Sequence, residues 1–546
     1  MDNIKLSELL FPAEGKSCEY YEELYPARNL PEGAKVTRFA PSPTGFVHFG
    51  GLFPVLVCER LAHQSGGVFY LRIEDTDSKR EVEGAETDII KAFESFGIRF
   101  DESIIHGGEY GPYRQSDRKE IYTAFAKRLV AEGKAYPCFC TAEELTALRE
   151  KQEADKVVPG YYGEYVKCRD LSYEEIEANI KAGKPYVLRF KSFGDSSNKI
   201  KFTDLIKGTI EITENDIDHV LLKSDGIPTY HFAHAVDDHL MRTTHVVRGE
   251  EWLSSLPYHI QLFTALGFKV PKYLHISQLM RLEGTAKKKL SKRDKGAGLT
   301  SYISDGYAPE CVIEYVMTLL NSNFEDWRRA NPNEDIDKFP FSIKKMSASG
   351  SLFDLQKLAD VSKNVLSRMS AEEIYDRLVA WTKDYDAEFY ALLTERPDYA
   401  KAILSIGRGG PKVRKDFALY SEVKAYIGFF YDEYFEYVDS IPENFEKEDV
   451  KKALELFLES YDELDEQQLW FDKIKDIAAQ IGYSPDIKAY KADPSAFKGH
   501  VGDVSTFLRI AVSGKQSSPD MYAVMKILGK DKVEQRIKAF IEILSK

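Results

Sequence analysis

A strand, a sharp turn and a helix between residues 36 and 67 constrain the fold of this chain more than any other stretch. Residues 36–40 predict a short strand. Three residues that prevent regular structure come next, because proline fixes φ and glycine permits positive φ: Pro41, Pro43 and Gly45. Apolar side chains then recur on one side of a helix: Leu52, Val55, Leu56 and Leu61. The pair Gly66-Gly67 predicts the end of that helix.

The turn between this strand and this helix has the properties of a phosphate-binding loop. Pro54 lacks an amide N–H, so it fits only the first turn of the helix, which must begin near Gly50. Ser42, Thr44 and His48 then lie in a glycine-containing loop beside the unpaired N–H groups of the helix start, which attract anions. An ordinary strand–turn–helix with an incidental histidine is the alternative. Neither GxGxxG nor GxxxxGK[ST] is present, which argues against a dinucleotide fingerprint or a P-loop.

Bulk properties describe a soluble protein of several domains. A chain of 546 residues is too long for one core and predicts roughly three to five domains. The charged N-terminus and the lack of a run of 18 apolar residues predict a cytoplasmic protein without a membrane partner. The net charge of −14 argues mildly against nucleic-acid binding, but residues 287–295 hold six Lys and Arg and offer a local basic face. A solvated loop is the alternative for that run.

The order of the predicted elements indicates a parallel sheet. Strand and helix alternate from residue 36 to a helix ending near Gly133, and they predict a doubly wound α/β fold with its ligand crevice at the strand C-termini. Arg38 lies at the end of the first predicted strand and Glu74 at the end of the second, so both are expected near that crevice. Residues 136–225 mix short helices with β-rich runs and look like an insertion. From residue 352 the chain reads as helix after helix.

Several motifs give this organisation a more specific meaning. APSPTG-x-x-H-x-G is followed by RIEDTD, then by a VDDH segment, VVRGEEW and the pentad KLSKR at residues 289–293. These words resemble the signatures of bacterial-type glutamyl-tRNA synthetases of class I, with HFGG at residues 48–51 in place of the family's HIGH tetrad and KLSKR in place of KMSKS. The resemblance implies a Rossmann-like parallel-sheet catalytic domain with an α+β insertion and an all-α C-terminal half.

The resemblance also implies a division of the chain. Six segments are expected: an N-terminal extension at 1–34, the two halves of the catalytic nucleotide-binding domain at 35–135 and 226–299, an acceptor-stem-binding insertion at 136–225, a stem-contact helical domain at 300–375 and a helical anticodon-binding region at 376–546. The implied reaction uses ATP with Mg²⁺ to convert L-glutamate to glutamyl-adenylate, and then transfers the glutamyl group to the terminal ribose of tRNA(Glu). A monomer is expected.

The resemblance assigns two groups of site residues. His48 and Lys292 are the expected catalytic residues, because they match the histidine and the mobile lysine that contact the ATP phosphates. The ATP-binding set is Ser42, Thr44, Gly45, His48, Gly50, Gly51, Lys289, Ser291, Lys292 and Arg293. Glutamate carries two carboxylates and an ammonium, so its site needs guanidinium groups and a carboxylate. The glutamate-binding set is Arg38, Ala40, Ser42, Glu74, Tyr230, His234 and Arg248.

For each glutamate-site residue, a structural ion pair is the alternative. His234 departs from the family, where many relatives have asparagine at or near this position. An imidazole titrates near neutral pH, so a substrate contact by His234 predicts pH-sensitive glutamate binding.

Two further sites are expected. Cys138, Cys140 and Cys168 resemble the thiols that hold structural zinc in some family members, although Asp170 stands where those members have histidine. Three reduced thiols are the alternative. Arg408, Lys412, Arg414 and Lys415 are candidates for contact with the anticodon end of the tRNA, and Arg414 matches an anticodon-reading arginine most closely. An exposed turn is the alternative there.

Four other functions compete with a glutamate–tRNA ligase. The same enzyme with relaxed specificity would also glutamylate tRNA(Gln), and a glutaminyl-type ligase would differ by ending in β-barrels. A small synthetase-like protein that glutamylates a modified tRNA base would lack the helical half. An RNA-binding paralogue without catalysis would explain the altered HFGG tetrad.

Overall fold

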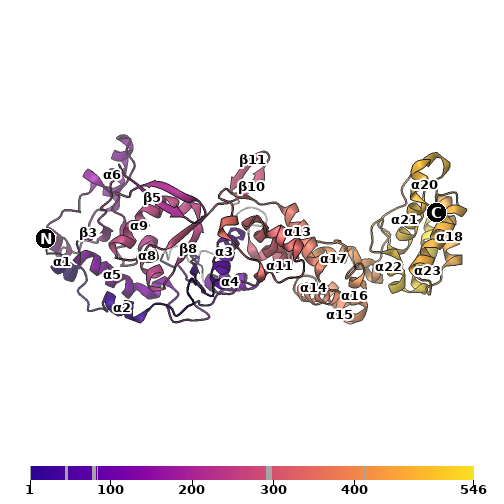
Figure 1. Ribbon diagram of the computed structural model, residues 1–546, viewed down its shortest axis with the longest axis horizontal. Coiled ribbons are helices and arrows are strands. Elements are labelled where there is room, and N and C mark those ends of the chain that lie inside the picture. The colour runs from indigo at the N-terminus through magenta and orange to yellow at the C-terminus, as the bar shows by residue number, and fades with distance from the viewer. Residues whose placement is uncertain (1, 44–46, 77–81, 83, 290–297, 411–412) are drawn as a thin grey trace. The chain divides into compact units, whose positions relative to one another are not determined.

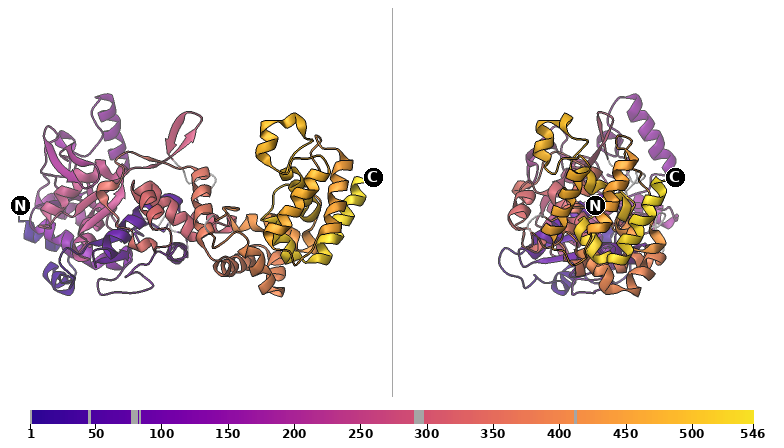
Figure 2. Two further views of the ribbon diagram at one scale, coloured as in Figure 1. Left: turned by 45° about the vertical axis from the view of Figure 1, so that its right-hand side comes forward. Right: turned by 90° about the vertical axis from the view of Figure 1, so that its right-hand side faces the viewer.

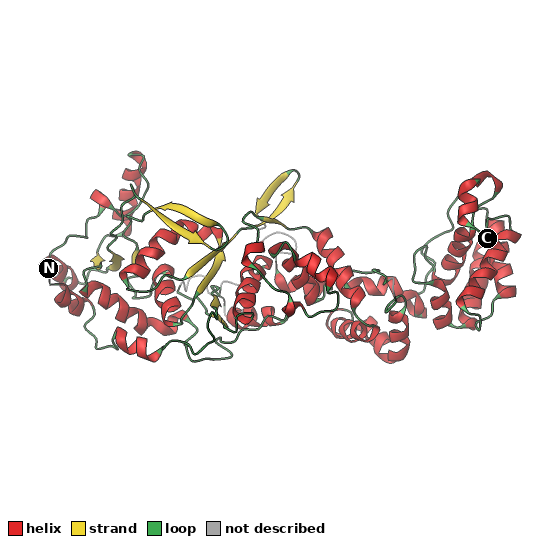
Figure 3. Cartoon of the chain, viewed as in Figure 1, coloured by secondary structure: helices red, strands yellow, loops and turns green. Residues whose placement is uncertain are grey.

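The computed structural model describes every residue except 1, 44–46, 77–81, 83, 290–297 and 411–412. The chain forms two compact units (Figure 1). The first contains residues 1–301 and 316–354, and the second contains residues 302–315 and 355–546. All the strands of the described residues belong to the first unit, whereas the second is helical (Figure 3). The predicted combination of a parallel-sheet part with an all-α C-terminal half is therefore confirmed.

The first unit contains both strands and helices. Its strands are β1 Val36–Phe39, β2 Val68–Leu71, β3 Ala135–Cys138, β4 Val187–Phe190, β5 Lys199–Asp204, β6 Gly208–Thr213, β7 Val220–Leu222, β8 His245–Gly249, β9 Lys272–Ile276, β10 Leu279–Glu283, β11 Ala286–Lys289 and β12 Ser351–Leu352. Its helices are α1 Asn3–Leu10, α2 Cys18–Leu24, α3 Leu52–His63, α4 Ala85–Glu94, α5 Lys119–Ala131, α6 Ala142–Ala154, α7 Tyr173–Lys181, α8 Tyr230–Leu240, α9 Leu256–Ala265 and α12 Phe324–Ala330. Helices α10 Leu299–Asp305 and α11 Pro309–Leu320 each contain residues of both units.

Four parallel strands form the centre of the first unit. β1 pairs with β2 and β8 pairs with β9, each pair in parallel. β1 and β8 lie side by side, and the Thr244 N–H, just before β8, donates a hydrogen bond to the Val36 carbonyl at 2.9 Å. The C-terminal ends of all four strands therefore share one edge, which is where open α/β sheets bind their ligands.

Side chains of β1 alternate between two helical layers, as the period of a strand requires. On one face, the Thr37 hydroxyl donates to the Cys58 carbonyl of α3 at 2.8 Å. On the other face, Arg38 points to α8 and reaches Asp238. Tyr70 of β2 lies on that same side, in the core that includes residues of α5, α8 and α9. The alternation therefore places a guanidinium from β1 against the acidic end of α8.

The segment between α5 and α8 contains five antiparallel strands, β3 to β7. β3, β4 and β7 form one sheet in the order β3-β4-β7, and β5 pairs with β6 in a hairpin. The β10–β11 hairpin stands away from the parallel strands and carries three exposed lysines, Lys287, Lys288 and Lys289 (Figure 2).

Residues 1–34, whose role the sequence leaves open, pack on helices of the first unit. Leu6, Leu10 and Tyr21 are buried in the core that also contains residues of α5. The Arg28 guanidinium makes two hydrogen bonds to the Glu102 carboxylate, at 2.7 and 2.8 Å. The N-terminal segment is thus part of the folded unit, held by apolar burial and a largely buried ion pair.

The second unit is built of helices joined by short connections. Its remaining helices are α13 Leu355–Arg368, α14 Ala371–Tyr385, α15 Ala387–Glu395, α16 Pro397–Ser405, α17 Tyr420–Ile427, α18 Lys447–Ser460, α19 Gln467–Gln480, α20 Ile487–Ala492, α21 Val501–Ser513, α22 Met521–Leu528 and α23 Lys530–Leu544. Within the helical region expected from residue 352, residues 423–438 do not form a continuous helix: α17 ends at Ile427, and two 3-10 turns follow. Phe429, Phe430 and Tyr431 are buried in those turns, so their apolar character reflects burial and not a helical stripe.

Candidate functional site

The turn after β1 leads into a short 3-10 turn, Phe49–Gly51, directly before α3. The Gly50 N–H donates to His48 Nδ1 at 2.8 Å, so a neutral ring carries its proton on Nε2 and can donate from it. A Cβ on Gly50 would lie 2.9 Å from that Nδ1, which is closer than real Cβ contacts allow. Glycine at position 50 therefore permits the turn in which His48 caps its own helix.

A cavity of about 500 Å³ opens beside this turn. Its lining includes His48 and Gly50, the last residue of β8 (Gly249) with Glu251, residues 276–279 from the end of β9 to the start of β10, and Lys289. The residues that follow 290–297 also lie next to this turn. The Leu299 N–H donates to the Val47 carbonyl at 2.9 Å, and Gly298 forms a β-bridge with His48. The structure thus brings the histidine turn and both flanks of residues 290–297 to one place.

A buried charge network lies at the ends of β1 and β2. Asp238 of α8 accepts a hydrogen bond from Arg38 Nε at 3.0 Å and one from Arg72 Nη1 at 2.7 Å. Arg72 Nη2 donates to Glu74 at 3.1 Å. The two guanidiniums hold the pKa of the Asp238 carboxyl well below its usual value, against the opposing effect of burial. The predicted proximity of Arg38 and Glu74 is therefore confirmed, through Arg72 and Asp238.

Glu74 is buried at the centre of this network. Burial raises the pKa of its carboxyl to about 7, although Arg72 and Arg38 oppose the shift. Tyr230 is close enough to Glu74, Arg38 and Arg248 to interact with their charges. The centre of its ring lies 4.4 Å from that of Trp252. Tyr230 thus links the two halves of the predicted glutamate site.

Arg248, near the end of β8, has a different environment from Arg38 and Arg72. Its Nε donates to His275 Nε2 at 2.9 Å, its Nη1 lies 3.0 Å from His259 Nδ1, and its Nη2 donates to the Trp252 carbonyl at 3.4 Å. Its guanidinium also lies 4.6 Å from the centre of the Tyr273 ring. No carboxylate of the described residues lies within 4.0 Å of it. The charge of Arg248 is therefore uncompensated at close range.

His234 does not fit the pH-sensitive contact expected from the sequence. Its side chain is fully buried, with Nδ1 at 2.8 Å from Asp238 Oδ2 and Nε2 at 2.9 Å from the Tyr273 hydroxyl. Burial lowers the pKa of this imidazole to about 4, below the range in which the enzyme would be assayed. The position of His234 next to Asp238 explains why it differs from the expectation. Both of its ring nitrogens face protein groups, Asp238 and Tyr273.

The remaining members of the predicted ATP and glutamate sets divide into two groups. Ala40 and Gly51 are half-buried and Ser42 is exposed, and all three lie in the segment between β1 and α3. Thr44, Gly45, Ser291, Lys292 and Arg293 lie outside the described residues.

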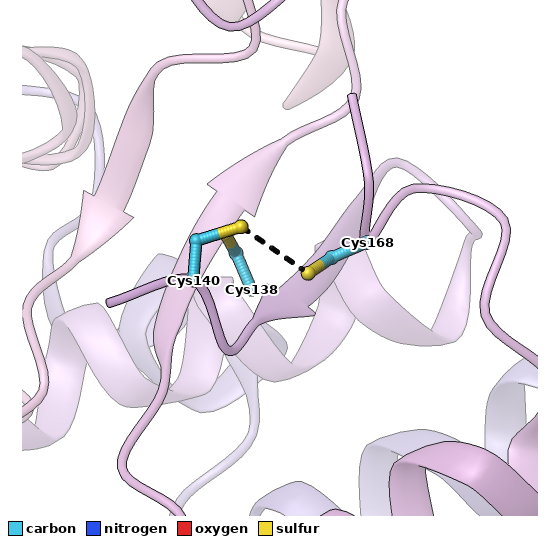
Figure 4. A group of neighbouring side chains, drawn as sticks. All are labelled: Cys138, Cys140 and Cys168. Carbon is cyan, nitrogen blue, oxygen red and sulfur yellow. Dashed lines mark hydrogen bonds between the residues drawn. The ribbon is translucent and has the colours of Figure 1, made fainter. Parts of the chain in front are cut away.

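Three thiols form a cluster next to β3 (Figure 4). The sulfur atoms of Cys138, Cys140 and Cys168 all lie within 4.8 Å of one another, and those of Cys140 and Cys168 are 3.7 Å apart. Two zinc-bound thiolates at about 2.3 Å from a tetrahedral ion lie about 3.8 Å apart, so this edge has the required length. Hydrogen bonds from the neighbouring thiols lower the pKa of Cys138. Three corners of a zinc tetrahedron are therefore present.

The fourth corner of that tetrahedron is not supplied by Asp170. Its side chain is 89% exposed and lies 3.8 Å from Lys191. The Tyr161 hydroxyl lies 3.4 Å from Cys140 Sγ, and it accepts hydrogen bonds from two backbone N–H groups.

Some side chains of the basic segment before α17, residues 408–415, make hydrogen bonds within the protein. Arg408 donates to the carbonyls of Leu404, Leu366 and Met369, which end two helices. Arg414 pairs with Asp416 at 2.9 Å and keeps an exposed face. Lys412 lies outside the described residues. Arg414 is thus better placed than Arg408 to contact a partner.

Sequence reasoning missed four residues that hold the site together: Arg72, Asp238, His259 and His275. The first two carried a usable signal, since Arg72 belongs to RIEDTD and Asp238 to VDDH, and buried charges occur in pairs. The two histidines lie 11 and 27 residues after Arg248, in segments without a motif, and only the parallel pairing of β8 with β9 places His275 beside Arg248.

Comparisons with known proteins agree with this arrangement. Residues 35–360 match the family "tRNA synthetases class I (E and Q), catalytic domain", and residues 373–541 match "Anticodon binding domain". A glutamate–tRNA ligase of Acetivibrio thermocellus is 53% identical over 99% of this chain and 100% of its own length. One of Clostridium perfringens is 49% identical, over 98% of this chain and 99% of its own.

Solved structures show the same similarity. A crystal structure of a glutamate tRNA ligase from Elizabethkingia meningosepticum in complex with its amino acid matches with a TM-score of 0.73 and 30% identity. That match covers 93% of this chain and 99% of the other. The chain therefore belongs to the class I aminoacyl-tRNA synthetases for glutamate and glutamine, and within them to the glutamate–tRNA ligases.

Proposed function

We propose that this protein activates L-glutamate with ATP and transfers it to the 3′-terminal ribose of tRNA(Glu). The glutamate α-carboxylate attacks the α-phosphorus of ATP, the bond to the β-phosphate oxygen breaks, and pyrophosphate leaves. A ribose hydroxyl of the tRNA then attacks the glutamyl carbonyl and AMP leaves. Chemistry of this kind needs alignment and positive charge where negative charge develops. The observation that carries the proposal is the shared cavity of His48, Gly50 and Lys289, which is also lined by Gly249, the residue after Arg248.

The nucleotide is assigned to that cavity. His48 Nε2 would donate to a phosphate oxygen, and Lys289, Lys292 and the other basic residues of 287–295 would supply positive charge. The set Ser42, Thr44, Gly45, Gly50, Gly51, Ser291 and Arg293 would surround the remaining parts of ATP. Among the described residues the cysteine cluster is the only group of three or more potential metal ligands. We therefore infer that Mg²⁺ arrives bound to the ATP phosphates.

The amino acid is assigned to the adjoining strand ends. Arg248 would bind a glutamate carboxylate through the guanidinium N–H groups that make no hydrogen bond to the described part of the protein. Arg38 has its Nε on Asp238, while its Nη2 makes no hydrogen bond to a described residue, so it can assist. Glu74 would bind the ammonium and Tyr230 would close the site. Ala40 and Ser42 border it through the turn after β1.

The parts of the chain have separate proposed roles. Residues 35–135 and 226–299 would hold the nucleotide and amino acid, with residues 136–225 inserted to bind the acceptor stem and the N-terminal extension, 1–34, bracing the catalytic part. Residues 300–375 would contact the stem and residues 376–546 would read the anticodon region, with Arg414 as one contact. No helix of the described residues is long and apolar enough to cross a membrane. A cytoplasmic monomer is part of the proposal, which size-exclusion chromatography with light scattering tests.

We also propose that Cys138, Cys140 and Cys168 hold a structural zinc ion. The 3.7 Å sulfur–sulfur edge and the burial of two of the thiols support it. Zinc would stabilise the loop around Tyr161, and no catalytic step depends on it. Metal analysis of protein purified without chelator should give about one equivalent of zinc, the number one site requires. Less than about a tenth of an equivalent would remove zinc from the proposal and leave three reduced thiols.

Glutamate-dependent ATP–pyrophosphate exchange, measured with tRNA present, tests the function. Exchange with glutamate and not with glutamine is expected, and its absence at every pH would favour a tRNA-binding paralogue. Charging of separated tRNA(Glu) and tRNA(Gln) then distinguishes a discriminating enzyme from one that glutamylates both. A glutaminyl-type enzyme is disfavoured by the helical second unit and by the glutamate–tRNA ligases that the chain resembles over its whole length.

A further inference from the structure

The protein partners of Arg248 are unusual because two of them are imidazoles. An arginine side chain has five N–H donors and no acceptor, so every nitrogen that faces it must present a lone pair. His275 Nε2 and His259 Nδ1 are therefore both unprotonated. A charged imidazolium at either position would direct an N–H at the guanidinium and place two cations in contact.

A second partner fixes the uncharged form of each imidazole. His275 Nδ1 lies 2.7 Å from Asp204 Oδ2 and carries its ring proton there. His259 Nε2 lies 2.8 Å from His231 Nδ1, so His259 donates and His231 accepts. Both rings are fully buried, and burial lowers the pKa of each below its usual value. Two separate hydrogen-bonded chains thus hold Arg248 without adding charge to it directly.

Three other buried arginines of this unit are held differently. Arg38 and Arg72 both bind the Asp238 carboxylate, and Arg118 binds Asp237 at 2.7 Å. Each of these guanidiniums is neutralised by a direct carboxylate contact. Asp204, the nearest acidic group in the chains around Arg248, is separated from it by the His275 ring. The fold therefore fixes the orientation of Arg248 while leaving its charge available.

We propose that His259 and His275 are positioning residues that hold Arg248 through uncharged acceptors, so that its full charge is offered to a substrate carboxylate and the site prefers glutamate to glutamine. This inference rests on the proposed binding of glutamate by Arg248. A carboxylate gains Coulomb attraction from an uncompensated guanidinium, whereas the amide of glutamine gains only hydrogen bonds. A protein carboxylate at position 259 or 275 would reduce that difference.

Two substitutions of equal size separate charge from shape. His259→Asn keeps an uncharged oxygen close to where Nδ1 stands, whereas His259→Asp places a carboxylate there. Relative to His259→Asn, we expect His259→Asp to raise the KM for glutamate at least about 30-fold, as for a disrupted buried charge contact. The kcat should change by less than about threefold, because ground-state binding is the main loss. The ratio of kcat/KM for glutamate over glutamine, from pyrophosphate exchange, should fall in parallel.

Controls keep the test decisive. His245→Asn and His245→Asp make the same pair of changes at a buried histidine at the opposite end of β8, and their KM values for glutamate should agree with each other. If His259→Asp does not fold, as judged by thermal melting, His275→Gln and His275→Glu replace the pair with the same expectation. Equal KM values and equal glutamate preference for the Asn and Asp variants would overturn the inference. Arg248→Ala separates the two proposals, since an unchanged KM in that variant would refute the glutamate site itself.

Discussion

Glu74 gives the sharpest prediction about the amino-acid site, because its carboxyl titrates where the enzyme works. Its pKa, raised by burial to about 7, means that the carboxylate needed for the substrate ammonium is largely protonated at pH 6 and largely ionised at pH 8. A proton and the ammonium compete for one group. The apparent affinity for glutamate should therefore rise with pH, by about tenfold between pH 6 and pH 8, as one titration at pH 7 requires.

Replacing Glu74 with glutamine removes both the charge and its titration. The loss of a hydrogen bond between charged groups costs about 2 kcal/mol, or about 30-fold in kcat/KM for glutamate at pH 8. The assay is glutamate-dependent pyrophosphate exchange from pH 6 to pH 8 with saturating ATP and tRNA. Glu59, another buried glutamate whose pKa is raised, lies on α3 outside the site, so Glu59→Gln should keep the wild-type profile.

Two results would refute this reasoning. A wild-type kcat/KM that is flat across this range would mean that Glu74 does not titrate near pH 7 or does not bind the substrate. A Glu74→Gln variant that keeps the wild-type slope would assign the titration to another group. His234 is excluded as that group by its pKa of about 4, so His234→Asn should leave the slope in place.

Three further predictions follow from other parts of the first unit. Gly50→Ala pushes a Cβ against His48 Nδ1 and should lower kcat/KM for ATP by about 30-fold or more, as for a lost transition-state donor. Gly51→Ala, whose Cβ would meet no atom of the described residues closer than that of Phe93 at 3.6 Å, should have a clearly smaller effect, and equal effects would contradict the role of the turn. Arg28→Ala removes the ion-pair partner of Glu102 and should destabilise the first unit by about 3–5 kcal/mol in urea unfolding, whereas Arg149→Ala, from an exposed pair, should change it by less than about 1 kcal/mol. Cys168→Ser should abolish zinc binding and lower the melting temperature of zinc-loaded protein to that of chelator-treated wild type, and full zinc retention would contradict the cluster.

Local sequence signals predicted the strand, turn and helix of residues 36–67 well, because the prolines and glycines there have strong backbone preferences. Pro54 limits where the helix can begin, and α3 starts at Leu52 after a single 3-10 turn. Gly66 takes a φ of 67°, and a Cβ on Gly67 would lie 1.9 Å from the Lys35 carbonyl oxygen, so both glycines are required where the helix ends and β2 begins. Such constraints act within a few residues and are visible in one sequence.

Contacts between distant segments were not predictable in the same way. The environment of Arg248 depends on the register of β8 against β9 and on the packing of α9, and a single sequence contains no periodic signal for either. The same limit explains His234, which looks polar and available in the sequence but lies in the core behind Asp238. The aromatic run at 429–431 likewise resembles a helix stripe until the buried turns are seen.

A crystal structure with a non-hydrolysable glutamyl-adenylate analogue tests the central claim most directly. We predict the nucleotide in the cavity lined by His48, Gly50 and Lys289, the glutamyl side-chain carboxylate within hydrogen-bond distance of Arg248, and the ammonium beside Glu74. A complex in which the adenylate lies elsewhere, or in which Arg248 makes no contact with it while His259 and His275 keep their places, would contradict it.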